Sequence, residues 1–152
     1  MSHFSAIDLQ TRLEVQDLLS RFCHALDHNK VETWVRLFAL EGYIDAPRLG
    51  CFSGREEIMK IPEMVRAQGG GAWRHYLNNM YIDHVEGSRD LRVEAYCMVS
   101  DWRQAGHVVR CWDFSARVGK RRDLKIISLK LTPVTDCEAQ GGSPDLSVIV
   151  AG

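Results

Sequence analysis

Several features that would mark a membrane or nucleic-acid protein are missing from this sequence. No apolar run reaches about 18 residues, the length that a membrane-spanning helix requires. A basic start followed by an apolar core, the pattern of a secretory signal, is also missing, so we expect a cytoplasmic protein with no membrane partner. The formal net charge of −1 gives the chain no general attraction to nucleic acid. The basic segment 119–125 has no aromatic platform beside it, and we interpret it as a solvated turn.

Motifs that bind cofactors or metals are equally scarce. The chain has no phosphate-binding loop and no dinucleotide fingerprint. Its five cysteines are an odd number without a CxxC pair, which is typical of reduced thiols. His24 and His28 have a spacing that can hold zinc, but Ala25 stands where an HExxH motif has its glutamate, and the sequence offers no third ligand. We therefore expect no cofactor and no metal, and side chains must perform any chemistry.

The pattern of apolar residues predicts a single domain of the α+β class. A spacing of three and four residues indicates helices over 7–28 and 31–39, followed by a short strand over 42–47. A third helix is predicted over 55–68, with Ser53 and Glu56 spaced as a capping box, and Pro62 should kink or divide it. After residue 71 the period changes to two, which predicts four long strands in an antiparallel meander. The first of these strands begins at residue 75, and the other three cover 92–102, 107–118 and 124–134. We therefore assign residues 1–134 to the domain and residues 135–152 to a C-terminal tail.

His75 opens the first long strand, directly after the glycine-rich break 69–71. Side chains alternate along a strand, so the pattern places Leu77, Asn79 and Tyr81 on the face that carries His75. A histidine and an asparagine among apolar neighbours indicate the floor of a pocket. A half-buried structural histidine is the alternative.

Asp27 lies in the last turn of the first predicted helix, beside its apolar stripe. The carbonyl end of a helix disfavours a negative charge, and burial acts in the same direction. Such surroundings suit a carboxylate that serves as a general base near neutral pH. The alternative role of Asp27 is to end the helix or to bind Asn29.

Short motifs in a fixed order resemble the NTF2-like superfamily, and within it the SnoaL-like branch with polyketide cyclases, scytalone dehydratase and a dehydrochlorinase. The resemblance covers about residues 7–134. The separation of 48 residues between Asp27 and His75 is similar to that between the catalytic aspartate and histidine of the dehydrochlorinase. The motifs are Ala25-Leu26-Asp27 followed by Trp34, Phe52-Ser53-Gly54-Arg55, Arg74-His75 with Asn79, and Cys111-Trp112-Asp113.

The resemblance implies a curved, antiparallel-rich sheet that forms a cone wrapped by the three N-terminal helices, with a pocket inside. It implies that Asp27 and His75 meet there as a catalytic dyad, in which the histidine moves a proton and the aspartate orients it. It also places the face shared by Cys111 and Asp113 toward the interior. Together with the mostly apolar lining, this predicts a cofactor-independent lyase or isomerase, of dehydratase or cyclase type, for a hydrophobic small molecule. The predicted substrate-binding residues are Tyr43, Asn79, Cys111 and Asp113.

Two other functions remain open at this point. The chain also resembles the small subunit of ring-hydroxylating dioxygenases, a non-catalytic assembly protein that requires a large partner subunit. An epoxide hydrolase of the limonene type needs an Asp-Arg-Asp set, for which Asp27, Arg74 and Asp113 are the candidates. Whichever function holds, we expect a homodimer or homotrimer, because the outer face of such a sheet is normally buried in an oligomer. Arg92, Tyr96, Met98 and Trp102 are predicted on that face.

Overall fold

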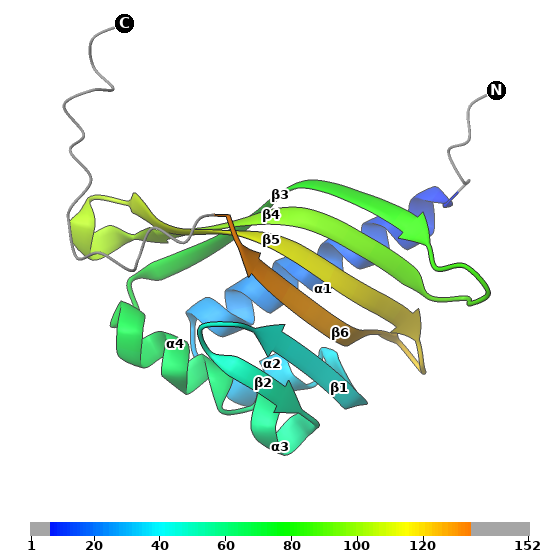
Figure 1. Cartoon of the computed structure of the whole chain (residues 1–152), viewed down its shortest axis with the longest axis horizontal. Helices are drawn as coiled ribbons and strands as arrows, with labels where there is room; N and C mark the ends of the chain where they lie inside the picture. The colour runs from blue at the N-terminus through cyan, green and yellow to red at the C-terminus, as the bar shows by residue number, and fades with distance from the viewer. Residues whose placement is uncertain (1–6, 135–152) are drawn as a thin grey trace, which may run out of the picture.

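The computed structural model describes residues 7–134 and has one curved sheet with helices on its concave side (Figure 1). The sheet contains six strands in the order β2-β1-β6-β5-β4-β3 and does not close into a barrel. This confirms the predicted α+β class. The predicted tail, 135–152, and Cys137 lie outside the described residues. The strands are β1 (Phe38–Ala46), β2 (Gly50–Ser53), β3 (Trp73–His84), β4 (Leu91–Asp101), β5 (His107–Lys120) and β6 (Leu124–Pro133).

The long helix α1 (Leu9–Asp27) lies across the sheet and supplies one wall of the core. Asp8 caps its start, accepting a hydrogen bond from the Thr11 backbone N–H at 2.9 Å. At its other end Asn29 has a left-handed backbone with φ of 52°, which stops the helix just beyond Asp27. The predicted helix over 7–28 is confirmed apart from its two ends.

The segment after α1 differs from the prediction. Helix α2 (Val31–Val35) ends early, and Phe38 already opens β1, which pairs in parallel with β6. Trp34, Val35, Phe38 and Ala39 are all buried on the two sides of this junction, so the spacing of the apolar residues does not distinguish a helix from a strand. Strand β2 was not predicted, because its four residues are too few to show an alternation.

The third predicted helix is divided at Pro62, as expected, into α3 (Arg55–Ile58) and α4 (Ile61–Gly69). The predicted capping box is wrong. Gly54, with φ of 77°, precedes α3, and the backbone N–H of Ser53 donates to Glu57 Oε2 at 2.6 Å. Glu56 takes no part in that hydrogen bond, because the turn at Gly54 shifts the start of the helix by one residue.

A β-bulge interrupts β3 between Asn78 and Tyr81, where the register with β4 shifts. Asn79 has φ of 53° at this point, and the extra residue reverses the alternation beyond it. As a result Asn79 and Tyr81 are exposed, while Ile82 is buried. The prediction that Tyr81 shares the face of His75 is therefore wrong, whereas Asn79 borders, with His75, a groove between α1 and β3.

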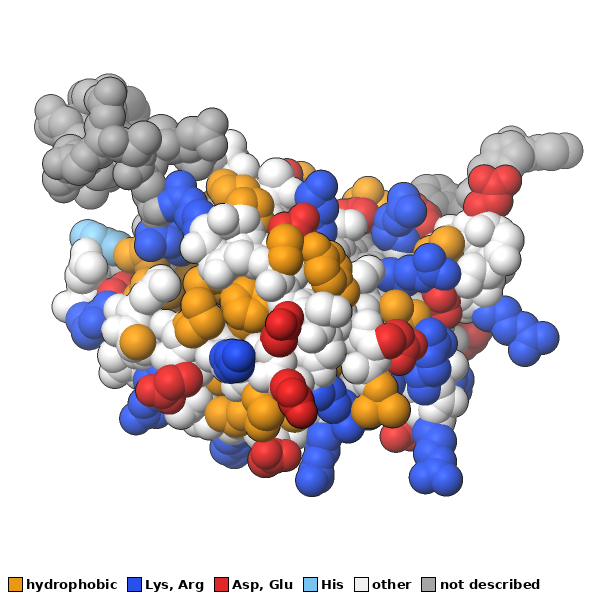
Figure 2. Space-filling model, turned by 60° about the horizontal axis from the view of Figure 1, so that its bottom comes forward, with side chains coloured by type: hydrophobic (Ala, Val, Ile, Leu, Met, Phe, Trp, Pro, Cys, Tyr) orange, Lys and Arg blue, Asp and Glu red, His pale blue; other side chains and the backbone are white. Residues whose placement is uncertain are grey.

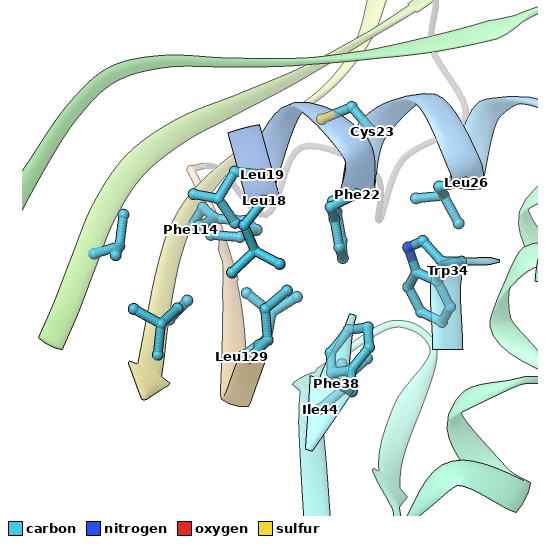
Figure 3. Close-up of a cluster of buried hydrophobic side chains, with 14 of the residues drawn as sticks. Leu18, Leu19, Phe22, Cys23, Leu26, Trp34, Phe38, Ile44, Phe114 and Leu129 are labelled. Carbon is cyan, nitrogen blue, oxygen red and sulfur yellow. The ribbon is translucent and has the colours of Figure 1, made fainter. Parts of the chain in front are cut away.

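The core lies between α1 and the concave face of the sheet (Figure 3). Phe22 of α1 packs against Phe114 of β5 with ring centroids 5.9 Å apart, and Trp34 packs against Phe38 at 4.9 Å. Burying each such side chain stabilises the fold by about 1.5–3 kcal/mol.

None of the helices within 7–134 is long and apolar enough to cross a membrane. Over the described part of the face in Figure 2, basic and acidic side chains are intermixed.

Candidate active site

Asp27 and His75 meet where the end of α1 approaches the start of β3. Asp27 Oδ1 lies 2.6 Å from His75 Nδ1, and Asp27 Oδ2 accepts the backbone N–H of His75 at 3.0 Å. The two side chains are only 5% and 10% exposed, respectively. Because both carboxylate oxygens are engaged, the carboxylate fixes the position of the strand and the orientation of the ring together. The sequence-predicted pair is therefore in hydrogen-bond contact.

A tight turn between α4 and β3 delivers His75 to this position. Gly70 and Gly71 have φ of 58° and 77°, a left-handed conformation that glycine adopts without strain. At Gly69 a Cβ would lie 2.5 Å from Cγ of Trp73, so the turn also requires a residue without a side chain there. The glycine-rich break therefore allows the indole of Trp73 to pack on the end of α4, two residues before His75.

A cavity of about 330 Å³ opens beside His75, between α1, α4 and the concave face of the sheet. Its lining is mainly aromatic and aliphatic, with side chains such as Phe22, Leu26, Trp34, Val99, Trp112 and Leu129. Its volume is at the lower end of the range for small-molecule sites. His75 also borders an open groove between α1 and β3, which has a more polar lining. The central cavity is the better candidate for a substrate, because its apolar walls exclude water from the imidazole.

The buried carboxylate of Asp101, paired with the half-exposed Arg103, holds Trp73 against the cavity. Asp101 at the end of β4 accepts hydrogen bonds from Trp73 Nε1 at 3.0 Å and from Arg103 Nη2 at 2.6 Å. These bonds, above all those from Arg103, hold the pKa of the Asp101 carboxyl well below its ordinary value. The Asp101 side chain is 2% exposed. This cluster therefore fixes one wall of the cavity.

Cys97 lines the cavity, but its thiol is poorly suited to act as a nucleophile. Burial, and then the negative charge of Asp27, raises the pKa of Cys97 to about 12. The same two influences, with Cys97 itself, raise the pKa of the neighbouring Cys23. Both thiols remain protonated near neutral pH, so neither is an activated nucleophile.

The predicted interior position of Cys111 and Asp113 is wrong. Both are exposed on the outer face of β5, because Phe114, Ala116 and Val118 fill the concave side and alternation turns the odd-numbered residues outward. The residues of this motif that face the cavity are Trp112 and, two positions earlier, Arg110. Extending the alternation back from Phe114 would have found Arg110 from sequence.

The other two predicted binding residues also lie outside the central cavity. Tyr43 of β1 is 39% exposed and borders a groove on the outer face of the sheet, with Lys130. Asn79 borders the open groove between α1 and β3 that His75 shares. The polar cavity-lining side chains that sequence reasoning missed are Arg48, Gln68 and Arg110. Arg48 follows β1 in a turn, and Gln68 belongs to α4, so no periodic pattern identified them.

The set required for an epoxide hydrolase is not assembled. Arg74 Nη1 donates to the backbone oxygens of Gly71 at 3.1 Å and Trp73 at 2.7 Å, and Asp113 is on the outer face.

The rings of His24 and His28 stack with centroids 6.3 Å apart. Within the described part of the chain, no three His, Cys, Asp or Glu residues are grouped so that they could hold a metal ion.

Solved structures with the same fold are numerous but distant in sequence. A protein of unknown function from Nostoc punctiforme with a cystatin-like fold has a TM-score of 0.74 at 20% identity, over 93% of this chain and 97% of that one. The protein Aln2 from a Streptomyces species has a TM-score of 0.73 at 16% identity, over 83% and 92%. A protein provisionally named scytalone dehydratase, from Novosphingobium aromaticivorans, has a TM-score of 0.68 at 16% identity, over 84% and 86%. At these identities the likeness is one of fold.

Sequence comparison gives the family. No curated protein matches the chain significantly. Residues 8–122, which include Asp27, His75 and most of the sheet, match the SnoaL-like domain. The resemblance drawn from the short motifs is thereby confirmed, and the chain belongs to the SnoaL-like domain family.

Proposed function

We propose that this protein is a cofactor-independent lyase or isomerase in which His75 removes a proton from carbon of a hydrophobic substrate. The observation that carries the proposal is the hydrogen-bonded pair of Asp27 and His75 on the wall of an apolar cavity. Its family includes cyclases and dehydratases, which supports chemistry of this type.

The two hydrogen bonds of Asp27 assign a role to each nitrogen of the ring. An ionised carboxylate can only accept, so His75 Nδ1 carries the hydrogen at the 2.6 Å contact, and Nε2 keeps its lone pair. Nε2 is then the atom that takes the proton. Asp27 stabilises the imidazolium that forms, and its second bond to the His75 backbone prevents the ring from turning away.

The proposed reaction begins with proton transfer from a C–H bond to His75 Nε2. The electron pair of that bond moves into an adjacent activating group, such as a carbonyl. In an elimination it then expels a leaving group from the neighbouring carbon, and the imidazolium returns its proton to that group. In an isomerisation the proton returns to a different carbon. Apolar walls support both paths, because excluding water strengthens the electrostatic interactions in the site.

Hydrogen–deuterium exchange at carbon tests this step without knowledge of the natural substrate. A panel of apolar ketones, esters and β-hydroxyketones is incubated with the protein in D2O, and deuterium incorporation or elimination is followed. We expect exchange with wild type and a loss of at least about 100-fold in His75→Ala, the usual contribution of a general base. His84→Ala, at the exposed end of the same strand, is the matched control and should retain the wild-type rate.

The contrary result has a clear meaning. If His75→Ala and Asp27→Asn both react at wild-type rates, the pair is a structural hydrogen bond and not a catalytic one. The non-catalytic assembly subunit then becomes the better hypothesis, and copurification with a large oxygenase subunit is the experiment that follows.

A further inference from the structure

Trp34 brings a buried hydrogen-bond donor to the central cavity. Its side chain is 1% exposed and lines the cavity together with Phe22 and Leu26 of α1. The indole nitrogen Nε1 makes no hydrogen bond to any residue within 7–134. In Figure 3 this nitrogen lies on the edge of the indole that is turned toward Phe22, beneath α1. Buried N–H groups without a partner are rare in native proteins, because they reduce the stability of the fold.

The composition of the cavity lining explains why Trp34 finds no acceptor there. Among the described residues that line the cavity, none is an aspartate, glutamate, asparagine, serine, threonine or tyrosine. The arginine and tryptophan side chains of the lining only donate. Apart from the weakly accepting sulfur of Cys97, the side-chain acceptors are Gln68, which is exposed, and His75, whose Nε2 the proposed reaction uses for the proton. A molecule in the inner part of the cavity must therefore supply the acceptor itself.

Aromatic packing fixes the indole of Trp34 in this orientation. Its ring centroid lies 5.5 Å from that of Phe22 and 4.9 Å from that of Phe38. Trp73 lines the same cavity and provides the contrast, since its Nε1 donates to Asp101 at 3.0 Å. The chain thus satisfies the less buried of these two indoles from within and leaves the more buried one for a ligand. A donor that is already held in place loses little entropy when the ligand binds.

We propose that Trp34 Nε1 donates a hydrogen bond to a carbonyl oxygen of the substrate. This inference rests on the proposed function and adds to it the residue that holds the activating group. When the C–H bond breaks and His75 Nε2 takes the proton, the electron pair of that bond forms a carbon–carbon double bond. The π pair of the carbonyl then moves onto its oxygen. The hydrogen bond from Trp34 strengthens as this negative charge develops, so that Trp34 both selects the substrate and stabilises the enolate.

α-Tetralone and tetralin test the proposal, because they have the same bicyclic body and differ only in the carbonyl group. Trp34→Phe retains an aromatic ring and removes the N–H donor. We expect its affinity for α-tetralone to fall by about three- to tenfold relative to its affinity for tetralin. The space left by the smaller ring affects both ligands, so the ratio of the two affinities isolates the hydrogen bond. Trp102→Phe changes a residue that is 59% exposed and outside the cavity, so this control should leave the ratio unchanged.

The indole N–H resonance of Trp34 in nitrogen-15-labelled wild type gives a second measurement, which does not depend on the folding of a variant. Through-bond experiments assign the resonance. We expect α-tetralone to move it downfield and to slow its exchange with solvent, because a new hydrogen bond forms. Tetralin should not do so. The N–H of Trp73, which already donates to Asp101, should respond alike to the two ligands, and that of Trp102 should not respond.

An equal response of the Trp34 resonance to the two ligands would overturn the proposal, because the N–H would then be turned to the ring of Phe22, a weaker acceptor. An equal loss of the two affinities in Trp34→Phe would also overturn it. In D2O, Trp34→Phe should exchange the hydrogens beside the carbonyl of α-tetralone about 10²-fold more slowly than wild type, and a wild-type rate would contradict the role assigned to Trp34.

These results separate the present proposal from the catalytic role of His75. His75→Ala should lose exchange at carbon and retain the downfield shift of Trp34 with α-tetralone. If His75→Ala exchanges at the wild-type rate while that shift is observed, the proposed base is wrong and the binding role of Trp34 stands. If exchange depends on His75 and the shift is missing, the base stands and the assignment of Trp34 is wrong.

Discussion

Asp27 holds His75 at two points, through the ring nitrogen at 2.6 Å and through the backbone N–H at 3.0 Å, across 48 residues of chain. The second bond is the more informative for the architecture, because it ties the last turn of α1 to the first residues of β3. Any movement of the helix end relative to the strand would also move the imidazole. The site is therefore built into the junction of two rigid elements, where a catalytic geometry is best preserved.

Replacing Asp27 by asparagine should separate catalysis from folding. Asparagine has nearly the same shape and can still accept the backbone N–H of His75, but it provides no negative charge for the imidazolium. We expect turnover to fall by about 10²–10⁴-fold, with the melting temperature nearly unchanged. Exchange kinetics and thermal unfolding measured on the same sample check this. If Asp27→Asn unfolds instead, the carboxylate is required for the stability of the fold, and His75→Gln would then be the cleaner test of catalysis.

Two cysteines should resist alkylation in the folded protein while two others react. The pKa of Cys97 is about 12 and that of Cys23 is raised, chiefly because both thiols are buried. At pH 8 a thiol with a pKa of about 12 is roughly one part in ten thousand thiolate, the reactive form. Cys51 and Cys111 are exposed. Iodoacetamide followed by peptide mass spectrometry should therefore label Cys51 and Cys111 first.

Labelling in guanidinium chloride is the control for that experiment, because all thiols become accessible when the chain unfolds. Rapid labelling of Cys97 in the folded protein would contradict its place on the cavity wall. Addition of a ligand that fills the cavity should slow the labelling of Cys97 further and leave the rate at Cys111 unchanged.

The Asp101–Arg103 pair should contribute to stability above its titration range and lose that contribution in acid. The pKa of the Asp101 carboxyl in the folded protein lies well below its ordinary value. The contribution of the pair to the free energy of unfolding is therefore complete above about pH 4, where Asp101 is ionised in the unfolded chain as well. It is lost as the pH falls from that point toward the folded-state pKa. Wild type and Asp101→Asn should therefore differ in free energy of unfolding at pH 7, and the difference should shrink below pH 4. A difference that is constant with pH would contradict the assignment.

The outer face of the sheet is the proposed oligomer interface. Tyr76 and Tyr96 are 42% and 54% exposed on neighbouring strands, where a lone chain leaves large aromatic side chains in water. We propose that a second copy covers this face. Light scattering should give the mass of a dimer or trimer, and Tyr96→Lys should reduce it toward that of the monomer, while Trp102→Lys, in the turn after β4, should have less effect. A monomeric wild type would contradict this prediction.

The sequence predicts the parts of this fold that depend on local pattern. Helix α1 and the four long strands follow from spacing, and Asp27 and His75 follow from the family resemblance. Where local pattern fails, the cause is a long-range or single-residue effect. The bulge at Asn79 turns Tyr81 outward, and no alternation rule contains such an extra residue. The parallel pairing of β1 with β6 joins segments that are far apart in the chain, which no local pattern contains. Tyr43 lies on the outer face because Ile44 and Ala46 take the core side of β1.

The opposite error occurred at β5, where the alternation was available but the wrong face was assigned to the interior. Phe114, Ala116 and Val118 are more apolar as a set than Cys111 and Asp113, and by that criterion Trp112 and Arg110 belong to the concave side. The cost of burying Arg110 argues against that criterion when the arginine is considered alone. A charged residue in phase with core residues is therefore a useful signal of a cavity in the core, and Arg110 does line one.

Gly69→Ala should destabilise the protein, although alanine is normally the better helix residue. At an exposed helix interior the substitution favours folding by about 1 kcal/mol. Here the new Cβ would lie 2.5 Å from Cγ and 2.7 Å from Cδ2 of Trp73, whose indole is held by its hydrogen bond to Asp101. Overpacking of this kind costs about 1–3 kcal/mol, so we expect the clash to outweigh the gain in helix propensity and the melting temperature to fall. In a Trp73→Ala background the same substitution should be neutral or stabilising. A cost that is unchanged in that background would show that the indole is not what Gly69 accommodates.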